Sequence, residues 1–347
     1  MRIAIVNDTR IALEGLKRVI ASAPEHEIIW LAHDGVEAVK CCNADTPDLI
    51  LMDLIMPNMD GVEATRQIMT QCPCAILVVT STVSGNTPQV FEAMGAGALD
   101  AVNTPVIGAD NMAEGSLTLL QKINTISKLI CAEGPSSTAP IQTPKGQTKT
   151  NHMLIAIGSS TGGPRALAQI LGNLPANLPA SIVIIQHVDQ QFSQSFIDWL
   201  NEQTPLTVRM AQHNTTPQPG TVLVSDSNKH LTINAQGKLI YVDEPRDYPY
   251  RPSVNVFFSS MAKYWMGNAI GILLTGMGKD GANGLLDMRT RGFATIAQNQ
   301  VSCAVYGMPK AAVHLNAADS ILHINKIAPQ IAEWVSSKQH STMAGHT

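Results

Sequence analysis

Three side chains after residue 150 of the 347-residue sequence have the types that nucleophilic catalysis requires, namely Ser160, His187 and Asp280. Ser160 lies in G-S-S-T-G-G-P, which contains the G-x-S-x-G pattern that exposes a serine on a sharp turn between a strand and a helix. A serine that attacks a carbonyl, a histidine that accepts its proton and a carboxylate that orients the imidazole together form a hydrolase triad. The three residues therefore predict acyl-transfer chemistry.

Each of these residues follows an apolar run with the length of a buried strand, at 153–157, 181–186 and 269–274. Because the carboxyl ends of parallel strands share one edge of a sheet, we expect the three side chains to meet there. A further strand is expected at 293–297, and helices over 164–171, 193–202 and 254–265. Segments 221–224, 230–233 and 238–242 are expected to form an antiparallel insertion in this mostly parallel sheet.

Each candidate also has a purely structural interpretation. The Gly/Ser-rich turn could bind an anion on its backbone N–H groups, Asp280 could cap the helix that follows it, and His187 could be a half-buried histidine. Four other histidines have no comparable partner at a strand end and are assigned structural or surface roles: His213, His230, His314 and His323.

The first half of the chain predicts a second α/β sheet. Five apolar runs, at 3–6, 28–31, 49–52, 76–79 and 99–102, alternate with helical patterns, which indicates a doubly wound parallel sheet. Asp8, Asp53 and Thr80 come at the ends of three of these strands. Two carboxylates with room for water suit Mg²⁺, and a carboxylate beside Mg²⁺ can accept a phosphoryl group. Taken singly, Asp8 could instead cap a helix and Asp53 could close a turn.

The composition restricts the class of protein. A net charge of −4 and a pI near 6.2, without a basic tract, give no reason to expect a nucleic-acid partner. The six cysteines form no C-x-x-C pair, so a zinc site is not expected. No apolar run reaches the length of a membrane span and no signal peptide is recognisable, so we expect a cytoplasmic protein with reduced thiols.

The expected organisation is a first domain over residues 1–130, a flexible linker over 131–151, a second domain over 152–338 and a disordered tail over 339–347. The linker is rich in Pro, Ser, Thr and Gln and has no apolar period.

The first domain resembles the receiver domain of two-component response regulators. The resemblance is carried by L-M-D-L-I-M-P-N-M-D-G-V-E around Asp53, by Asn7-Asp8, by Thr80, and by G-A-L-D-A-V-N-T-P at 97–105. It implies a flavodoxin-like sheet, with Asp53 as the phosphoacceptor, Asp8 and Asp53 as Mg²⁺ ligands, and Thr80 as the switch hydroxyl. It also implies a CheA-type histidine kinase as phosphodonor.

The second domain resembles the catalytic domain of the CheB family of chemotaxis protein-glutamate methylesterases. Five segments carry this resemblance: G-S-S-T-G-G-P at 158–164, I-I-Q-H at 184–187, R-P-S-V-N at 251–255, T-G-M-G-K-D-G-A at 275–282 and G-M-P-K-A-A at 307–312. It implies that Ser160, His187 and Asp280 form the triad, with Thr161 and Met277 close to the substrate carbonyl. The Met277 N–H is then a candidate oxyanion donor. Arg251 is expected to position the substrate.

The family's activity is removal of methyl groups, as methanol, from glutamate methyl esters on methyl-accepting chemotaxis receptors, and deamidation of receptor glutamines. The esterase reaction needs no cofactor, and the membrane is reached only through the receptors. Three departures from the family pattern resemble its Wsp-type, WspF-like branch: the N-T-P ending with Thr104 in place of lysine, V-S-D-S at 224–227 in place of an Ala-Pro-Gly turn, and Asn255 in place of aspartate. Asn7, in place of an acid, is a further departure within the receiver.

Two other functions compete with this one. A receiver fused to a nucleotide-binding sheet would use the Gly/Ser turn to hold phosphate, and Ser160→Ala would leave its function intact. A DNA-binding response regulator would need a basic recognition helix, which the sequence after residue 150 does not contain.

Overall fold

The structure, a computed structural model, describes residues 1–81, 85–105, 112–131, 152–188, 190–226, 228–246, 248 and 250–343. Its chain divides into two compact units, Met1–Gly134 and Pro135–Thr347. Apart from Cys131, the segment expected to be a linker lies outside the described residues. No helix in the described ranges is both long enough and apolar enough to span a membrane.

Unit 1 is a five-stranded parallel sheet with the strand order β2-β1-β3-β4-β5, which is the flavodoxin-like doubly wound order. Its strands are β1 (Arg2–Val6), β2 (Glu27–Ala32), β3 (Leu49–Met52), β4 (Ala75–Thr80) and β5 (Asp100–Asn103). Its helices are α1 (Arg10–Ala21), α2 (Gly35–Ala44), α3 (Gly61–Gln71), α4 (Thr87–Ala96) and α5 (Met112–Cys131). The predicted fold of this half is confirmed.

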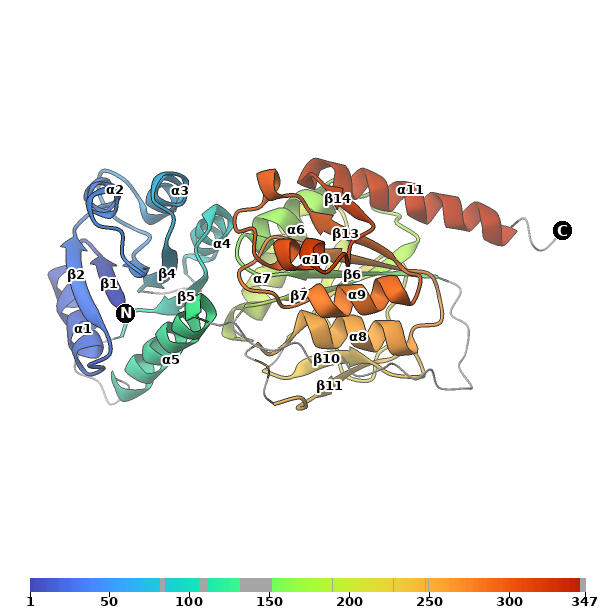
Figure 1. The fold of residues 1–347 in the computed structure, drawn as a ribbon, viewed down its shortest axis with the longest axis horizontal. Coiled ribbons are helices and arrows are strands. Elements are labelled where there is room, and N and C mark those ends of the chain that lie inside the picture. Colours follow the sequence, from blue (N-terminus) through green and yellow to red (C-terminus); the bar gives the residue numbers. More distant parts are fainter. Residues whose placement is uncertain are drawn as a thin grey trace. The chain divides into compact units, whose positions relative to one another are not determined.

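The helices of unit 1 cover both faces of the sheet, with α2 and α3 on one side and α1 and α5 on the other (Figure 1). The buried residues of α1 recur at helical spacing, and they pack against Ile3, Ile5 and the buried side chains of α5. This two-sided burial explains why the strands read as continuous apolar runs rather than as alternating patterns.

Unit 2 is built on a seven-stranded sheet with the order β14-β13-β12-β6-β7-β9-β8, in which every neighbouring pair is parallel. Its strands are β6 (Met153–Ser159), β7 (Ala180–Gln186), β8 (Thr207–Met210), β9 (Thr221–Val224), β12 (Ala269–Leu273), β13 (Ala294–Gln298) and β14 (Ser320–Leu322), and β10 (His230–Ile233) and β11 (Leu239–Val242) form a separate antiparallel pair. Its helices are α6 (Gly163–Gly172), α7 (Gln190–Gln203), α8 (Val254–Tyr264), α9 (Ala282–Thr290), α10 (Met308–His314) and α11 (Ile324–Met343), with a 3₁₀ turn at Gln300–Ser302.

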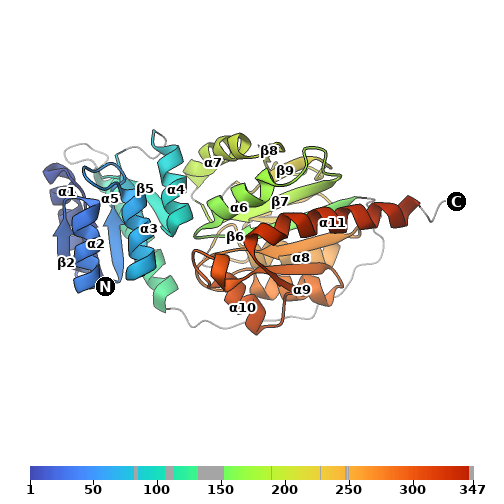
Figure 2. The same cartoon turned by 90° about the horizontal axis from the view of Figure 1, so that it is seen from above.

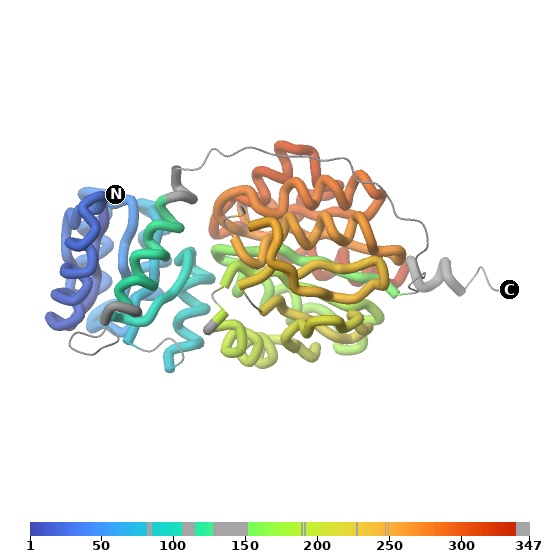
Figure 3. Tube along the Cα trace, turned by 90° about the horizontal axis from the view of Figure 1, so that it is seen from below, coloured from blue at the N-terminus to red at the C-terminus, as the bar shows by residue number. Residues whose placement is uncertain are grey.

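The site is organised around the centre of this sheet, where β6 lies between β12 and β7. In Figure 3 the green trace of β6 and β7 runs through the middle of unit 2, with later segments on either side. One face of the sheet packs against α8, α9 and α10, whose buried side chains join those of Leu154, Val183 and Ile185 in one core. On the other face α11 lies alongside α6, as Figures 1 and 2 both show.

Two expectations for unit 2 were wrong in detail. Segment 221–224 belongs to the parallel sheet as β9, not to the antiparallel insertion, and it pairs with β7 and β8. The connection from Val224 to β10 is short enough for a hairpin, but this strand instead continues the sheet beyond β7. The polar segment from residue 339 also remains helical as far as Met343, because Gly and Pro are absent from it before Gly345. Residues 344–347 lie outside the described part of the chain.

Candidate active site and phosphorylation site

Ser160 lies on the turn between β6 and α6. The turn is closed by Gly162, which has φ 77° and is the N-cap of α6. A Cβ atom at this position would lie 2.5 Å from Ala304 Cβ, so both the positive φ and the close approach require glycine. Pro164 occupies the first turn of α6, where its missing N–H costs nothing. The G-x-S-x-G pattern thus forms the strand–turn–helix that the sequence predicted. The serine itself is not exposed as the pattern indicated, because only 6% of Ser160 is accessible once the turn packs against the rest of the unit.

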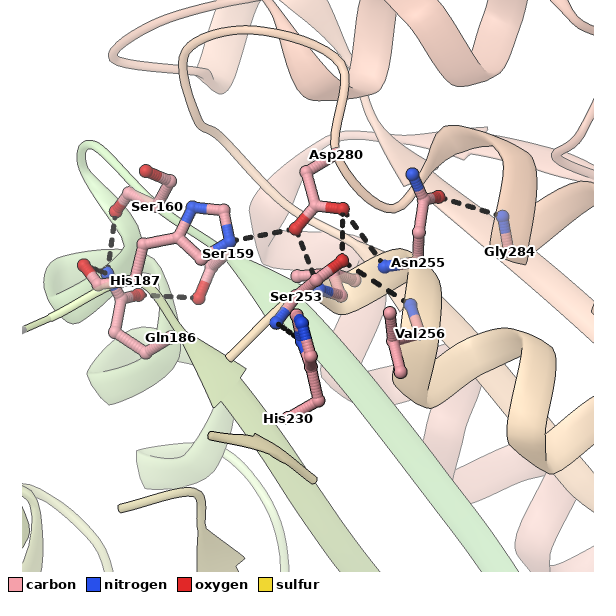
Figure 4. A network of polar contacts seen from close by, with 11 residues as sticks. Ser159, Ser160, Gln186, His187, His230, Ser253, Asn255, Val256, Asp280 and Gly284 are labelled. Carbon is pink, nitrogen blue, oxygen red and sulfur yellow. Dashed lines mark hydrogen bonds and ion pairs between the residues drawn. The ribbon is translucent and has the colours of Figure 1, made fainter. Parts of the chain in front are cut away.

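A buried glutamine joins the serine turn to the end of β7. The side-chain nitrogen of Gln186 donates to the carbonyl oxygens of both Ser160 and His187, each at 3.0 Å. Its side-chain oxygen accepts from the Ser159 hydroxyl at 2.6 Å. These three bonds satisfy the buried amide and fix the two backbones next to each other (Figure 4).

His187 and Asp280 form a buried pair. The distance from His187 Nε2 to Asp280 Oδ2 is 2.9 Å, and the two side chains are 7% and 5% exposed. An ionised carboxylate only accepts hydrogen bonds, so Nε2 carries the proton and Nδ1 has the free lone pair. Nδ1 is buried and has no hydrogen-bond partner among the described residues. The imidazole is therefore held by one nitrogen and available as a base at the other, with the two nitrogens exchanged relative to the serine-protease arrangement.

Asp280 is held ionised by a helix that begins 26 positions before it. Its Oδ1 accepts from the Ser253 hydroxyl and the Asn255 N–H, and its Oδ2 accepts from the Val254 N–H as well as from His187. These groups belong to the N-terminus of α8, whose dipole favours a negative charge. Burial alone would raise the pKa of Asp280, but the hydrogen bond and charge of His187 and the α8 donors outweigh it and hold the pKa below its usual value.

The alternative role for Asp280, as cap of the helix that follows, does not apply. The N-cap of α9 is Gly281, and Asp280 binds the start of α8 instead (Figure 4). His230 supports the same helix end: its Nδ1 accepts from the Ser253 N–H at 3.1 Å, and its Nε2 lies 2.9 Å from the Pro245 carbonyl oxygen. Burial lowers the pKa of His230, which suits this neutral, structural role. Asn255 ties α8 to α9 by accepting from the Gly284 N–H at 2.9 Å.

The loop after β12 lies against the serine. Ser160 N–H donates to the Thr275 carbonyl at 3.1 Å, and a Cβ atom on Gly276 would lie 2.9 Å from Ser160 Cβ. Thr275 Oγ1 in turn donates to the Thr161 carbonyl at 2.9 Å. Among the hydrogen bonds of the described residues, none uses the N–H of Met277 or of Thr161 as donor. Thr161 follows Ser160 in the chain and Met277 follows Gly276, so both N–H groups stay candidates for binding an oxyanion.

Arg251 makes no hydrogen bond to Ser160, His187 or Asp280 among the described residues. It is exposed, and its guanidinium donates to the Arg246 carbonyl oxygen at 2.6 Å. Sequence reasoning missed three contributors to the site, Gln186, Ser253 and Tyr250. Gln186 and Ser253 fall inside the I-I-Q-H and R-P-S-V-N segments, so those segments were the available signal, whereas Tyr250, whose ring stacks on His187, had none.

The carboxyl edge of the unit 1 sheet gathers the other predicted residues. Asn7 donates through Nδ2 to Asp53 Oδ2 at 2.8 Å, while its Oδ1 accepts from the Thr9 N–H at 2.9 Å. The Leu54 N–H donates to Asp53 Oδ1 at 2.7 Å. Asp8 is exposed and does not cap α1, whose N-cap is Thr9.

Asp53 and Asp8 fit a magnesium ion by their charge. Burial, and then the charge of Asp8, raise the pKa of Asp53 to about 6, against hydrogen bonds from the Leu54 and Ile55 N–H groups and the Thr80 hydroxyl. A divalent cation would relieve this repulsion between carboxylates. The described residues contain no cluster of three or more His, Cys, Asp or Glu side chains that could hold a metal. A two-carboxylate site completed by water is thus what the residues can offer.

Thr80 ends β4 and is buried. Its Oγ1 accepts from Asn86 Nδ2 at 3.1 Å, and its carbonyl oxygen accepts from the Thr104 N–H at 2.9 Å. Thr104, in the position of the family's lysine, therefore lies next to Thr80 through the β4–β5 ladder. Asn86 is a further residue that sequence reasoning did not identify.

Both parts of the chain match known protein families. Residues 155–331 match the family model described as CheB methylesterase, and residues 3–114 match the response regulator receiver domain. The chain is 51% identical over 333 residues to protein-glutamate methylesterase/protein-glutamine glutaminase 3 of Pseudomonas aeruginosa, covering 96% of this chain and 99% of that one. It is 50% identical over 334 residues to the corresponding protein of the group 3 operon of Pseudomonas putida, with coverage of 96% and 99%.

Among solved structures, the CheB methylesterase catalytic domain of Thermotoga maritima is similar to the second unit. It is 33% identical with a TM-score of 0.51, and the match covers 54% of this chain and all of that domain. Together with the sheet, the serine turn and the His187–Asp280 pair, these matches show that the chain belongs to the CheB methylesterase family, with an N-terminal response regulator receiver domain.

Proposed function

We propose that the protein is a phosphorylation-regulated protein-glutamate methylesterase and protein-glutamine glutaminase that acts on chemoreceptors, with Ser160 as nucleophile, His187 as base and Asp280 as its orienting carboxylate. The observation that carries the proposal is the 2.9 Å contact from His187 Nε2 to Asp280, which leaves Nδ1 buried and unpartnered. The names of the relatives support the substrate class.

In this mechanism Ser160 Oγ bonds to the carbonyl carbon of a glutamate methyl ester as its proton passes to His187 Nδ1. The imidazolium then protonates the methoxy oxygen, the C–OCH₃ bond breaks and methanol leaves. Water hydrolyses the acyl-serine by the same route in reverse. Asp280 remains ionised throughout, and the N–H groups of Met277 and Thr161 stabilise the oxyanion. A glutamine side chain has the same carbonyl and would release ammonia.

The receiver supplies the regulation in this proposal. Asp53 accepts a phosphoryl group from a CheA-type histidine kinase, and Thr80 responds to it. Asp8 and Asp53 would hold Mg²⁺, which compensates negative charge during phosphoryl transfer. The esterase reaction itself uses only side chains and backbone N–H groups of this chain.

The proposed organisation is a receiver over 1–130, a linker over 131–151 and a methylesterase domain over 152–338, working in the cytoplasm on the receptors' cytoplasmic helices. Arg251, exposed near the start of α8, is proposed to position the receptor. Thr104 in the N-T-P ending, V-S-D-S at 224–227 and Asn255 are the features that favour a Wsp-type branch of the family. The P. putida relative is named for a group 3 operon, a term that specifies no such branch.

The nucleotide-binding alternative is disfavoured by the state of the Gly/Ser turn. Two of its N–H groups are already used, because Ser160 donates to Thr275 and Gly163 donates to the Ser160 carbonyl. A phosphate cradle requires such groups to be free.

Methanol release from methylated receptors tests the proposal. The wild-type chain should release methanol, and Ser160→Ala should release none above background while remaining folded. A folded Ser160→Ala protein with near-normal activity would refute the serine mechanism.

A further inference from the structure

Tyr250 contacts the catalytic histidine in a way that the triad does not explain. Its ring is stacked on the His187 imidazole, with centroids 3.9 Å apart and planes 10° from parallel. Its hydroxyl oxygen is buried, yet it makes no hydrogen bond to any described residue. Leaving such a hydroxyl without a partner costs about 1–3 kcal/mol, so its retention points to a ligand.

The position of the hydroxyl indicates which ligand. A Cβ atom built on Gly278 would lie 3.8 Å from the Tyr250 hydroxyl oxygen, and one built on Gly276 would lie 2.9 Å from Ser160 Cβ. The short loop from Gly276 to Gly278 thus reaches from the nucleophile to the phenol, with the free N–H of Met277 between them. The hydroxyl therefore borders the space in which an acyl group bound to Ser160 would lie.

The chemistry of the phenol fits a donor. Burial, and then the charge of Asp280, raise the pKa of Tyr250 far above its usual value, so the hydroxyl keeps its proton at neutral pH. An O–H donor, like a backbone N–H, stabilises a negative oxygen without transferring its proton.

We propose that Tyr250 is a catalytic residue whose hydroxyl donates a hydrogen bond to the acyl oxygen of the ester or amide attached to Ser160, while its ring face holds the imidazole of His187 in plane. The inference rests on the proposed methylesterase function. No bond to Tyr250 forms or breaks, and its contribution is a hydrogen bond that strengthens as the acyl oxygen becomes negative.

The two roles can be separated by two substitutions in the full-length protein. Tyr250→Phe removes only the hydroxyl and keeps the stacked ring, and Tyr250→Leu removes both. Tyr248→Phe is the matched control, since Tyr248 lies in the same segment, is 36% exposed, and makes an edge contact with His230 at 6.0 Å. Methanol release gives kcat and KM, and labelling by a fluorophosphonate, in which Ser160 Oγ bonds to phosphorus and fluoride leaves, gives a second rate.

Tyr250→Phe should lower kcat and the labelling rate by at least about tenfold, with little change in KM and an unchanged pH profile. Tyr250→Leu should lower kcat further and also shift the pH profile, because the imidazole loses its covering ring. Tyr248→Phe should match wild type. All rates are measured well below the unfolding midpoint of each variant, so that a change in stability does not affect the result.

A decrease of less than about tenfold for Tyr250→Phe in both assays would overturn the inference. It would leave the proposed function intact if wild type released methanol and was labelled at Ser160. Wild type that did neither would instead refute the proposed function itself.

Discussion

Asp53 and Asp280 both follow a parallel strand at the carboxyl edge of its sheet, yet their pKa values shift in opposite directions. Asp280 is the more deeply buried, and its pKa is lowered. Asp53 is only partly buried, and its pKa is raised to about 6, first by burial and then by Asp8. Both carboxylates accept four hydrogen bonds, so the difference lies in the neighbouring charge: Asp280 lies against His187, whereas Asp53 has the carboxylate of Asp8 nearby.

This contrast separates two uses of a buried carboxylate. A carboxylate that accepts four hydrogen bonds is fixed in both charge and position, which suits an orienting residue. A carboxylate that has a like charge beside it instead of an imidazole is destabilised until a cation or a covalent group arrives, which suits an acceptor of phosphate. The charge of the neighbouring side chain, and not the depth of burial, decides between them.

The largest expected effect comes from changing the charge of Asp280 without changing its shape. Each Asp280 oxygen accepts from two donors, so Asp280→Asn must turn its NH₂ group toward one of these pairs. If the NH₂ group faces His187, the imidazole must take the other tautomer and lose its base. We expect kcat for methanol release to fall by about 10³–10⁴-fold. A decrease of less than tenfold would show that Asp280 does not set the tautomer.

At Asp53 the corresponding substitution should abolish regulation while leaving basal activity. Asp53→Asn should give no phosphoryl adduct by mass spectrometry after incubation with a phosphodonor and Mg²⁺, and no stimulation of methanol release. Thr104→Lys is the complementary variant, because a cation beside Thr80 can pair with the phosphoryl group, so stimulation should increase. Full stimulation in Asp53→Asn would mean that the receiver responds to something other than phosphate.

The stability of unit 2 should also depend on Asp280, which sequence reasoning did not foresee. Asp280→Ala leaves the Ser253 hydroxyl and the first N–H groups of α8 without their acceptor, so the free energy of unfolding should fall by about 3 kcal/mol. The Ser160 hydroxyl makes no hydrogen bond to any described residue. Ser160→Ala should therefore change the free energy of unfolding by less than about 1 kcal/mol. Urea unfolding of both variants tests the difference, and equal midpoints would contradict the capping role.

The sequence could predict those features of the site that the order and direction of the strands determine, and it could not predict the others. That Ser160, His187 and Asp280 follow the same ends of neighbouring strands was predictable, because parallel strands deliver their end residues to one edge. The side-chain contact that the structure gives among them is the one between His187 and Asp280. The capping of α8 by Asp280 was not, because a capping pattern is read from adjacent residues and points to α9. Tyr250 lies in a segment without periodicity, so nothing in its spacing predicted a stack on His187. The parallel pairing of β9 was missed because pairing partners depend on the whole sheet.

The smallest expected effect is a pH dependence confined to unit 1. Because the pKa of Asp53 is raised from 3.8 to about 6 on folding, between these values the native state keeps a proton that the unfolded state has lost. Stability therefore falls as pH rises through this window, and the loss is complete above it. After a discount for partial exposure, we expect the free energy of unfolding of unit 1 to fall by about 1–2 kcal/mol across this window. Hydrogen exchange of peptides from β1 and β3 reports the free energy of opening.

The matched variants make this small effect measurable. The free energy of opening is measured for wild type and for Asp53→Asn at pH 4.5 and at pH 7. Comparing their difference at the two pH values cancels any constant cost of the lost Asn7 hydrogen bond. In an Asp8→Asn background this difference should change less with pH, because the substitution removes the charge that helps to raise the Asp53 pKa. Mg²⁺ at pH 7 should restore stability in wild type but not in Asp8→Asn, because the cation opposes the same repulsion. If the difference does not change with pH, Asp53 is no more strained than an ordinary surface carboxylate, and the contrast with Asp280 then rests on Asp280 alone.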